Sequence, residues 1–254
     1  MKKYRFTLFV FTLICISSSY NTDEYRIALG DRICIVKKTI TQANALTLIA
    51  LHDNENTAIE AFQSWTQQLN INLLELHQSD DRYLKCRYNN RDYCFDPNQV
   101  FSEKGIHNTL YEKNSSCPPE LVHIIKAFAD TLLKMFLNTR YHHYMIAIHN
   151  NSSENFSVLS YNNSSNATAV FVSKDEDIDD FFIVTDTSDY EYFKNMNLNV
   201  VLQSINAEED GSLSVYCQQN QIPYINIEAE HGHLNKQIEM IKIVYDLVSE
   251  KKGE

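Results

Sequence analysis

Glycine and proline are scarce in this chain, with five glycines and four prolines among 254 residues. None of the glycines forms a GxGxxG or Walker pattern, so the phosphate cradle of dinucleotide and P-loop enzymes is absent. No two cysteines have Cys-x-x-Cys spacing, which argues against a cysteine zinc site. The chain has only 22 Lys and Arg against 33 Asp and Glu, a formal charge of -11. We therefore expect no nucleic-acid partner, because phosphate binding requires basic residues.

The N-terminus has the composition of an export signal. Three basic residues within the first five positions precede the apolar run Phe6–Ile16, and Ser17–Ser19 supply the small residues that a signal peptidase needs. We predict a signal peptide over residues 1–19 and one exported domain, periplasmic or secreted, over 20–254. A membrane anchor is the less favoured alternative, because the apolar run is short for a bilayer. We expect no membrane span after cleavage.

Five cysteines remain after that cleavage, so at least one is unpaired. Cys86 and Cys94 flank a predicted turn at Asn89-Asn90. They are candidates for a disulfide across a hairpin, because export favours disulfides.

Apolar runs alternate with helical patterns along the whole domain. This alternation predicts an α/β fold with a mixed, mostly parallel twisted sheet and helices on both faces. The expected strands are Ala45–Leu51, Ile71–Leu76, Tyr144–His149, Asn155–Tyr161, Phe181–Asp186, Asn199–Ser204 and Pro223–Glu230, and a hairpin is expected at 82–95. The expected helices are Thr57–Leu69, 118–137, Ser212–Gln219 and His233–Val248.

Two polar clusters follow apolar strands in this pattern. His52 and Glu55 are three residues apart in a loop that leads into a helix, and His149 ends a second strand. Open α/β sheets bind ligands at the carboxyl ends of their strands. Two His and one Glu are a suitable ligand set for a catalytic zinc that keeps one position for water. We therefore predict that these three residues hold one Zn²⁺.

A third cluster lies near the end of the chain. Glu228 and Glu230 alternate along the last strand, so both point to the same face. A carboxylate beside a metal-activated water can accept its proton and pass it to a leaving amine. His231 and His233 follow and are interpreted as loop residues or supports for the ligands.

A fourth segment joins Arg91 to Asn98, seven residues later. An arginine near a zinc can stabilise the negative oxygen that forms when water attacks a carbonyl. Each of these four features, taken alone, is also compatible with ordinary solvated loops.

Taken together and in this order, the features resemble the zinc carboxypeptidase superfamily, and most closely its succinylglutamate desuccinylase/aspartoacylase branch. The resemblance extends over residues 45–230. It implies that Arg91 stabilises the oxyanion, that Asp96–Gln99 contains the substrate-binding residues Asn98 and Gln99, and that Glu228 rather than Glu230 is the general base. The family has Arg where this chain has Gln99. Gln cannot form a bidentate ionic pair, so recognition of a free C-terminal carboxylate stays open.

The resemblance implies a zinc-dependent hydrolase of amide bonds, a metallopeptidase acting on exported or cell-wall peptides. A deacylase of N-acylated amino acids and a non-catalytic binding protein on the same fold are the alternatives. A secreted α/β domain whose polar clusters are only loops is the third alternative.

Overall fold

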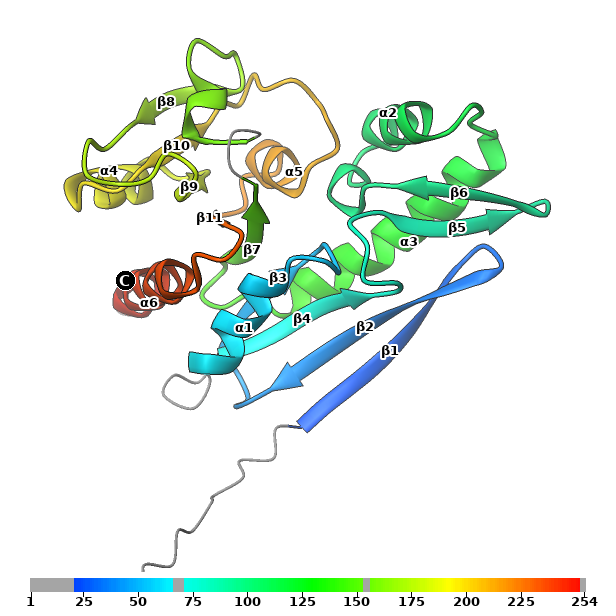
Figure 1. Ribbon diagram of the computed structural model, residues 1–254, viewed down its shortest axis with the longest axis horizontal. Helices are drawn as coiled ribbons and strands as arrows, with labels where there is room; N and C mark the ends of the chain where they lie inside the picture. The colour runs from blue at the N-terminus through cyan, green and yellow to red at the C-terminus, as the bar shows by residue number, and fades with distance from the viewer. Residues whose placement is uncertain (1–20, 66–70, 153–155, 252–254) are drawn as a thin grey trace, which may run out of the picture.

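The computed structural model describes residues 21–65, 71–152 and 156–251, so the predicted signal peptide lies outside the described residues. Its centre is a nine-stranded mixed sheet with the order β1-β2-β4-β3-β7-β11-β9-β10-β8 (Figure 1). The strands are β1 Asn21–Leu29, β2 Arg32–Ile40, β3 Leu46–Ala50, β4 Ile71–His77, β7 Met145–Asn151, β8 Ala167–Phe171, β9 Phe181–Val184, β10 Val200–Gln203 and β11 Tyr224–Glu230.

Helices cover both faces of this sheet. They are α1 Asn56–Trp65, α2 Glu103–Lys113, α3 Pro119–Asn138, α4 Thr187–Asn195, α5 Leu213–Gln219 and α6 Leu234–Glu250, with short 3-10 turns η1 Pro97–Gln99 and η2 Val158–Tyr161. A smaller two-stranded sheet, β5 Leu84–Tyr88 and β6 Arg91–Phe95, forms the predicted hairpin. None of the helices in the described part is long and apolar enough to cross a membrane.

Side chains of the central strands point alternately to the two faces of the nine-stranded sheet. In β7, Ile146 and Ile148 pack with α1, α4 and α6, whereas Met145 and Ala147 pack with α2, α3 and α5. Successive side chains of a strand point to opposite faces. A strand buried on both faces therefore reads as a continuous apolar run, which is why these strands were visible in the sequence.

The prediction of a mixed α/β sheet is confirmed, but the sheet is less parallel than expected. Four neighbouring strand pairs are parallel, namely β4-β3, β3-β7, β7-β11 and β9-β10, and four are antiparallel. The parallel block β4-β3-β7-β11 is at the centre. The antiparallel pairs come from the β1-β2 hairpin at one edge and from β9 and β8 toward the other.

Two local predictions are wrong. Residues 156–161 form no strand, because Ser157 begins a 3-10 turn in which its backbone N–H donates to Ser160 Oγ at 3.1 Å. The Cys86–Cys94 disulfide is also absent. Cys86 pairs with Tyr93 in the hairpin register and Cys94 with Lys85, so the two cysteines face opposite sides of the ribbon.

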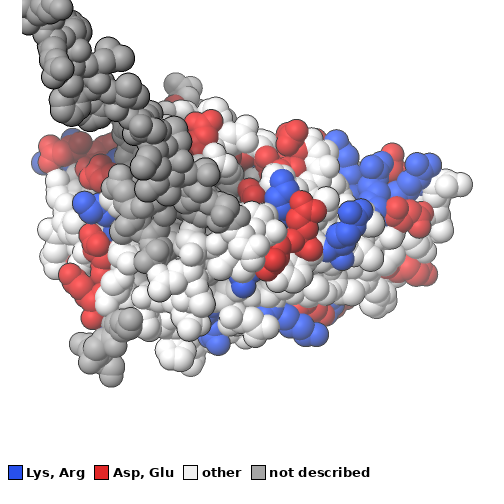
Figure 2. All heavy atoms as spheres, turned by 90° about the horizontal axis from the view of Figure 1, so that it is seen from below, with Lys and Arg blue, Asp and Glu red and all other residues white. Residues whose placement is uncertain are grey.

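Several elements were not expected from the sequence at all: β1, β2, α2, α4 and β8. Most are edge strands or short helices with exposed polar residues, which carry a weaker periodic signal. On the face shown in Figure 2, Lys and Arg side chains are frequent toward the end of the molecule where Figure 1 places the β1-β2 and β5-β6 hairpins.

A close backbone approach joins α2 to the loop that precedes α5. A Cβ atom on Gly105 would lie 2.4 Å from Gly211 Cα and 2.6 Å from the Gln99 carbonyl oxygen. Gly211 itself has a φ of +79°, which favours glycine. The Phe101 N–H donates to the Gly211 carbonyl at 2.9 Å. The contact therefore holds the segment after η1 against the segment before α5.

We predict that Gly105→Ala destabilises the protein by about 2 kcal/mol, although Ala normally improves a helix by about 1 kcal/mol over Gly. The added methyl group has no space between two backbone segments. Urea unfolding of the variant measures the effect. Asn108→Ala, an exposed position in the same helix, is the control and is expected to change stability by less than about 0.5 kcal/mol. Equal stability of the two variants would contradict the assigned contact.

Candidate metal centre and active site

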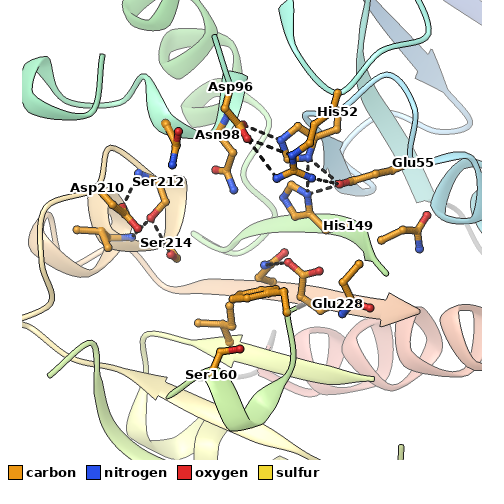
Figure 3. Close-up of a pocket in the computed structure, with 18 of the residues that line it drawn as sticks. His52, Glu55, Asp96, Asn98, His149, Ser160, Asp210, Ser212, Ser214 and Glu228 are labelled. Carbon is orange, nitrogen blue, oxygen red and sulfur yellow. Dashed lines mark hydrogen bonds and ion pairs between the residues drawn. The ribbon is translucent and has the colours of Figure 1, made fainter. Parts of the chain in front are cut away.

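Three adjacent strands of the parallel block position the predicted ligands and base. His52 follows β3, and His149 lies in β7, which continues two residues beyond it to Asn151. Glu228 in β11 is the parallel register partner of His149. Register partners on neighbouring strands share a face of the sheet, so Glu228 is beside His149 (Figure 3).

His52, Glu55 and His149 form a compact buried cluster. Their ligand atoms lie within 4.8 Å of one another, and this group could hold a metal ion. The His52 Nδ1 is 2.7 Å from Glu55 Oε1, the His149 Nδ1 is 2.9 Å from Glu55 Oε2, and the two Nδ1 atoms are 3.2 Å apart. The three side chains are 2–4% exposed as residues, so solvent does not separate them. The geometry thus brings together the three residues that the sequence singled out.

This donor set fits a borderline divalent cation. Two imidazole nitrogens and one carboxylate oxygen are the ligands that zinc accepts. Both imidazole rings direct Nδ1 toward the same point. A cation bound there would accept one lone pair from each ring. Ligand histidines usually donate their other ring N–H to a carboxylate. His52 has such a partner, since its Nε2 is 2.8 Å from Asp96 Oδ1.

Arg82 lies next to the cluster. Its guanidinium donates to Asp96 Oδ2 from Nε at 3.2 Å and contacts Glu55 Oε1 from Nη1 at 3.4 Å. Asp96 is at the N-cap of η1 and also accepts the Asn98 backbone N–H at 2.8 Å. Asp96 therefore links a cluster histidine, a guanidinium and the segment predicted to bind substrate.

The protonation states of the cluster follow from its burial and charges. Burial lowers the pKa of His52, but the Glu55 and Asp96 carboxylates outweigh it and raise the pKa to about 9. Burial raises the pKa of Glu55, but the neighbouring His52 and His149 hold it well below its usual range. Asp96, beside His52 and Arg82, has a pKa of about 2 despite its burial. In the metal-free protein, the Glu55 and Asp96 carboxylates therefore favour the protonated form of His52.

Glu228 differs from these carboxylates. It is buried, and its Oε1 accepts a hydrogen bond from Asn226 Nδ2 at 2.9 Å. Burial raises its pKa, and the negative charge of Glu55 opposes its ionisation further. A carboxyl group with a raised pKa is suited to accept and return a proton near neutral pH. Glu230 lies outside the cavity lining and contacts His233 instead, at 3.3 Å.

The cluster opens into a cavity of about 800 Å³. This volume is within the range of small-molecule and peptide side-chain sites. The cavity is lined by the cluster, by Arg82, Asn98, Gln99 and Glu228, and by polar residues from the opposite wall, among them Asp210, Ser212, Ser214 and Tyr161. The predicted substrate-binding residues Asn98 and Gln99 are therefore in contact with the same space as the cluster.

Arg91 is the predicted site residue that the geometry does not support. It is exposed at the start of β6, opposite Tyr88 in the hairpin, and does not line the cavity. The hairpin carries position 91 away from the sheet edge, whereas position 82 lies in the loop that leaves β4 at that edge. The guanidinium at the site belongs to Arg82, which lies 14 residues before Asp96.

Sequence reasoning missed many residues of the cavity lining, among them Arg82, Tyr161 and Asp210. A signal existed for Arg82, because it follows the predicted strand Ile71–Leu76 at the same edge as His52. Tyr161 was assigned to a strand that does not form. Asp210 lies in a loop without periodicity, and no sequence pattern connects that loop to the sheet edge.

Comparison with protein-family models found no match, and comparison with curated protein sequences found none either.

The loop that presents Arg82 is fixed by Asp53. Asp53 Oδ2 accepts the backbone N–H groups of Gln78, Ser79 and Asp80, each at 2.8 Å, and Asp53 Oδ1 is 2.9 Å from His77 Nδ1. Hydrogen bonds to Asp53 and Glu75 raise the pKa of His77 to about 9. Stability from a raised histidine pKa is present below its unfolded value near 6.5 and is lost as the pH rises through the folded value.

Between pH 6.5 and 9.5, we predict that the free energy of unfolding falls by on the order of 1 kcal/mol more in the parent chain than in His77→Gln. The difference is this small because His77 is partly exposed, which weakens its ion pairs. Urea unfolding at both pH values measures the difference, and His52 contributes equally to both proteins. His123→Gln, an exposed position on α3, is the control and should behave as the parent. A pH dependence unaltered in His77→Gln would contradict the assignment.

Proposed function

We propose that this chain is a zinc-dependent hydrolase of amide bonds, a metallopeptidase of the type seen in the zinc carboxypeptidase superfamily. The observation that carries the proposal is the buried convergence of His52 Nδ1, His149 Nδ1 and the Glu55 carboxylate, with Glu228 on the adjacent strand facing the same cavity. His52, Glu55 and His149 would hold the ion. When bound, zinc supplies a Lewis acid that activates water and polarises a carbonyl.

The side chains of the chain have separate roles in this reaction. Glu228 accepts a proton from the attacking water and returns it to the leaving nitrogen, since its pKa is raised by burial. Asp96 holds the ring of His52 in position through Nε2. The net reaction adds water across the C–N bond and releases a carboxylate and an amine.

Arg82 takes the role that the sequence resemblance assigned to Arg91. Among the described residues of the cavity lining it is the one guanidinium, and Glu55 and Asp96 orient it beside the cluster. A guanidinium there supports the negative charge that develops on the carbonyl oxygen. A favourable contact of this kind is worth most when water is excluded, and the cluster is buried.

Peptides are favoured over N-acylated amino acids as substrates. An N-acyl amino acid carries a free carboxylate, and Arg82 is the single Lys or Arg among the described residues that line the cavity. That guanidinium is already held by Asp96 and Glu55. Export of the domain, and hence extracellular or cell-wall peptides as substrates, stays a prediction that depends on residues 1–19.

Catalysis is favoured over binding alone by Glu228. Burial of a carboxyl group beside the His52–Glu55–His149 cluster lowers the stability of the fold unless hydrogen bonds or positive charges compensate for its lost hydration. Such a group is therefore expected to have a function. Its single hydrogen-bond donor is Asn226, and no Lys or Arg of the described residues pairs with it. A protein that only bound a metal or a peptide would not require this group.

The metal prediction is tested by zinc content and stability of the purified full chain. We expect one equivalent of zinc in the parent. His149→Ala should weaken zinc binding by more than about 100-fold, because it removes a ligand rather than a support. Free zinc at about 100 times Kd should stabilise the parent by about 2.7 kcal/mol. His123→Ala, exposed on α3, should bind zinc as the parent does, and equal zinc affinity in the two variants would refute the ligand assignment.

The base is tested by Glu228→Gln in the zinc-loaded protein. Hydrolysis of a peptide panel, followed by mass spectrometry, should fall by about 10²–10⁴-fold in kcat with zinc content unchanged. In the parent, the acid limb of the kcat/KM profile should lie above the pKa of an ordinary Glu, because burial raises that of Glu228. Glu230→Gln, on the same strand but outside the cavity lining, should retain activity.

A further inference from the structure

The two edges of the nine-stranded sheet differ in how open they are to another strand. At one edge, β8 has five residues, and its pairing with β10 shifts register between Leu202 and Gln203. Short strands and bulges are devices that protect a sheet edge. At the other edge, β1 has nine residues in unbroken register with β2 (Figure 1). Within the described residues, no strand pairs with the outer side of β1.

The side chains of β1 are also accessible on both of its faces. Thr22, Glu24, Arg26 and Ala28, which share one face, are all exposed, and Tyr25 on the other face is 42% exposed. An unpaired strand edge presents a row of backbone N–H and C=O groups, which is a template for pairing with another chain. The outer edge of β1 is therefore an interaction surface for a further strand.

The charges on β1 indicate which strand fits this surface. Charges on an edge strand usually discourage pairing, and like charges directly opposite each other destabilise a sheet. β1 instead has one negative and one positive side chain on the same face, Glu24 and Arg26, on either side of position 25. A second copy of β1 in antiparallel orientation presents these two side chains in the reverse order. Each charge can then lie opposite a charge of the other sign.

One register satisfies both the backbone and the charges. In an antiparallel pair, residues whose backbone groups point outward must oppose each other, so a two-fold axis passes beside a residue. An axis at Glu24 or Arg26 sets like charges opposite each other, and an axis at position 23 or 27 leaves both charges without a partner. An axis at Tyr25 sets Glu24 of each copy opposite Arg26 of the other. Tyr25 is also the middle of Asn21–Leu29, so the same register pairs the strand along its length.

We propose that two copies of this chain pair through β1 in a two-fold dimer, in which their sheets join into one continuous sheet. The two Tyr25 rings meet at the axis on one face, and two Glu24–Arg26 ion pairs form on the other face. Aromatic pairs and opposite-charge pairs across strands both stabilise a sheet. β1 does not line the cavity of the candidate active site, so dimerisation is independent of the proposed hydrolysis.

Charge reversal tests the register. Sedimentation velocity of the purified full chain over a range of concentrations gives Kd of the dimer. Glu24→Arg and Arg26→Glu should each raise Kd by at least about tenfold, because each sets two pairs of like charges opposite each other. The double variant Glu24→Arg/Arg26→Glu restores opposite charges and should return Kd to within about threefold of the parent. Thr168→Arg, exposed on the other edge strand, should leave Kd unchanged.

The double variant also separates dimerisation from an effect within one chain. Lys37 is the register partner of Glu24 in β2. Glu24→Arg brings a like charge to Lys37 whether or not position 26 is changed as well. Recovery in the double variant therefore requires the second copy, and circular dichroism verifies that each variant is folded.

A disulfide at the axis tests the same register by distance. In the proposed pair, the two Cα atoms of position 25 are about 5 Å apart, whereas those of position 23 are about 14 Å apart. Tyr25→Cys should therefore form an intermolecular disulfide under mild oxidation, and Asp23→Cys should not, since a disulfide requires Cα atoms within about 7 Å. The parent, which has the same described free cysteines, gives the background on a non-reducing gel.

Three results would each overturn the dimer. The first is a parent chain that stays monomeric at about 100 μM. The second is a Kd that neither charge reversal changes, or that the double variant does not restore. The third is cross-linking of Asp23→Cys as efficient as that of Tyr25→Cys. Each of them leaves the proposed hydrolysis standing.

Discussion

The arrangement of the site depends on the burial of charged groups that can be stabilised only by one another. Glu55, His52 and Asp96 are almost inaccessible to water, and each is within 2.8 Å of a partner of opposite charge in the metal-free protein. Removing one member of such a set leaves an uncompensated buried charge, which costs several kcal/mol. Each member of the cluster therefore stabilises the buried charge of the others. A divalent cation at the Nδ1 atoms would satisfy the same carboxylate.

The sheet determines where that cluster can form. Parallel pairing of β3, β7 and β11 brings their carboxyl ends to one edge, and the Glu228–His149 register sets the predicted base beside a ligand. This part was predictable from the sequence, because strands buried on both faces are continuous apolar runs and the polar residue that ends each run is conspicuous. His52 and His149 were found in this way, Glu55 was found from its spacing to His52, and the choice of Glu228 over Glu230 came from the resemblance. All four residues line one cavity.

The remainder of the site depends on contacts between segments that lack such a pattern. The resemblance implied Arg91, from its spacing to Asn98, and Arg82 was not considered. The choice is decided by the exit of the chain from β4, which leaves Arg82 at the sheet edge and sends Arg91 to an exposed turn. Asp210 comes from a loop and Tyr161 from the 3-10 turn η2, and no sequence pattern places either segment at the cavity. The edge strands β1 and β8 and their partly exposed neighbour β2 were missed because such strands carry little apolar periodicity.

The contrast between the two ends of the cavity gives the site its direction. At one end, nitrogen and carboxylate ligands surround the place for a cation, and Arg82 adds positive charge. At the other end, the described part of the lining contains the Asp210 carboxylate and no Lys or Arg. In the proposed reaction, this difference would favour a bound amide with its carbonyl oxygen toward Arg82 and the His52–Glu55–His149 group. The proposed amide hydrolysis would require such an orientation, because the scissile carbon would have to lie beside Glu228.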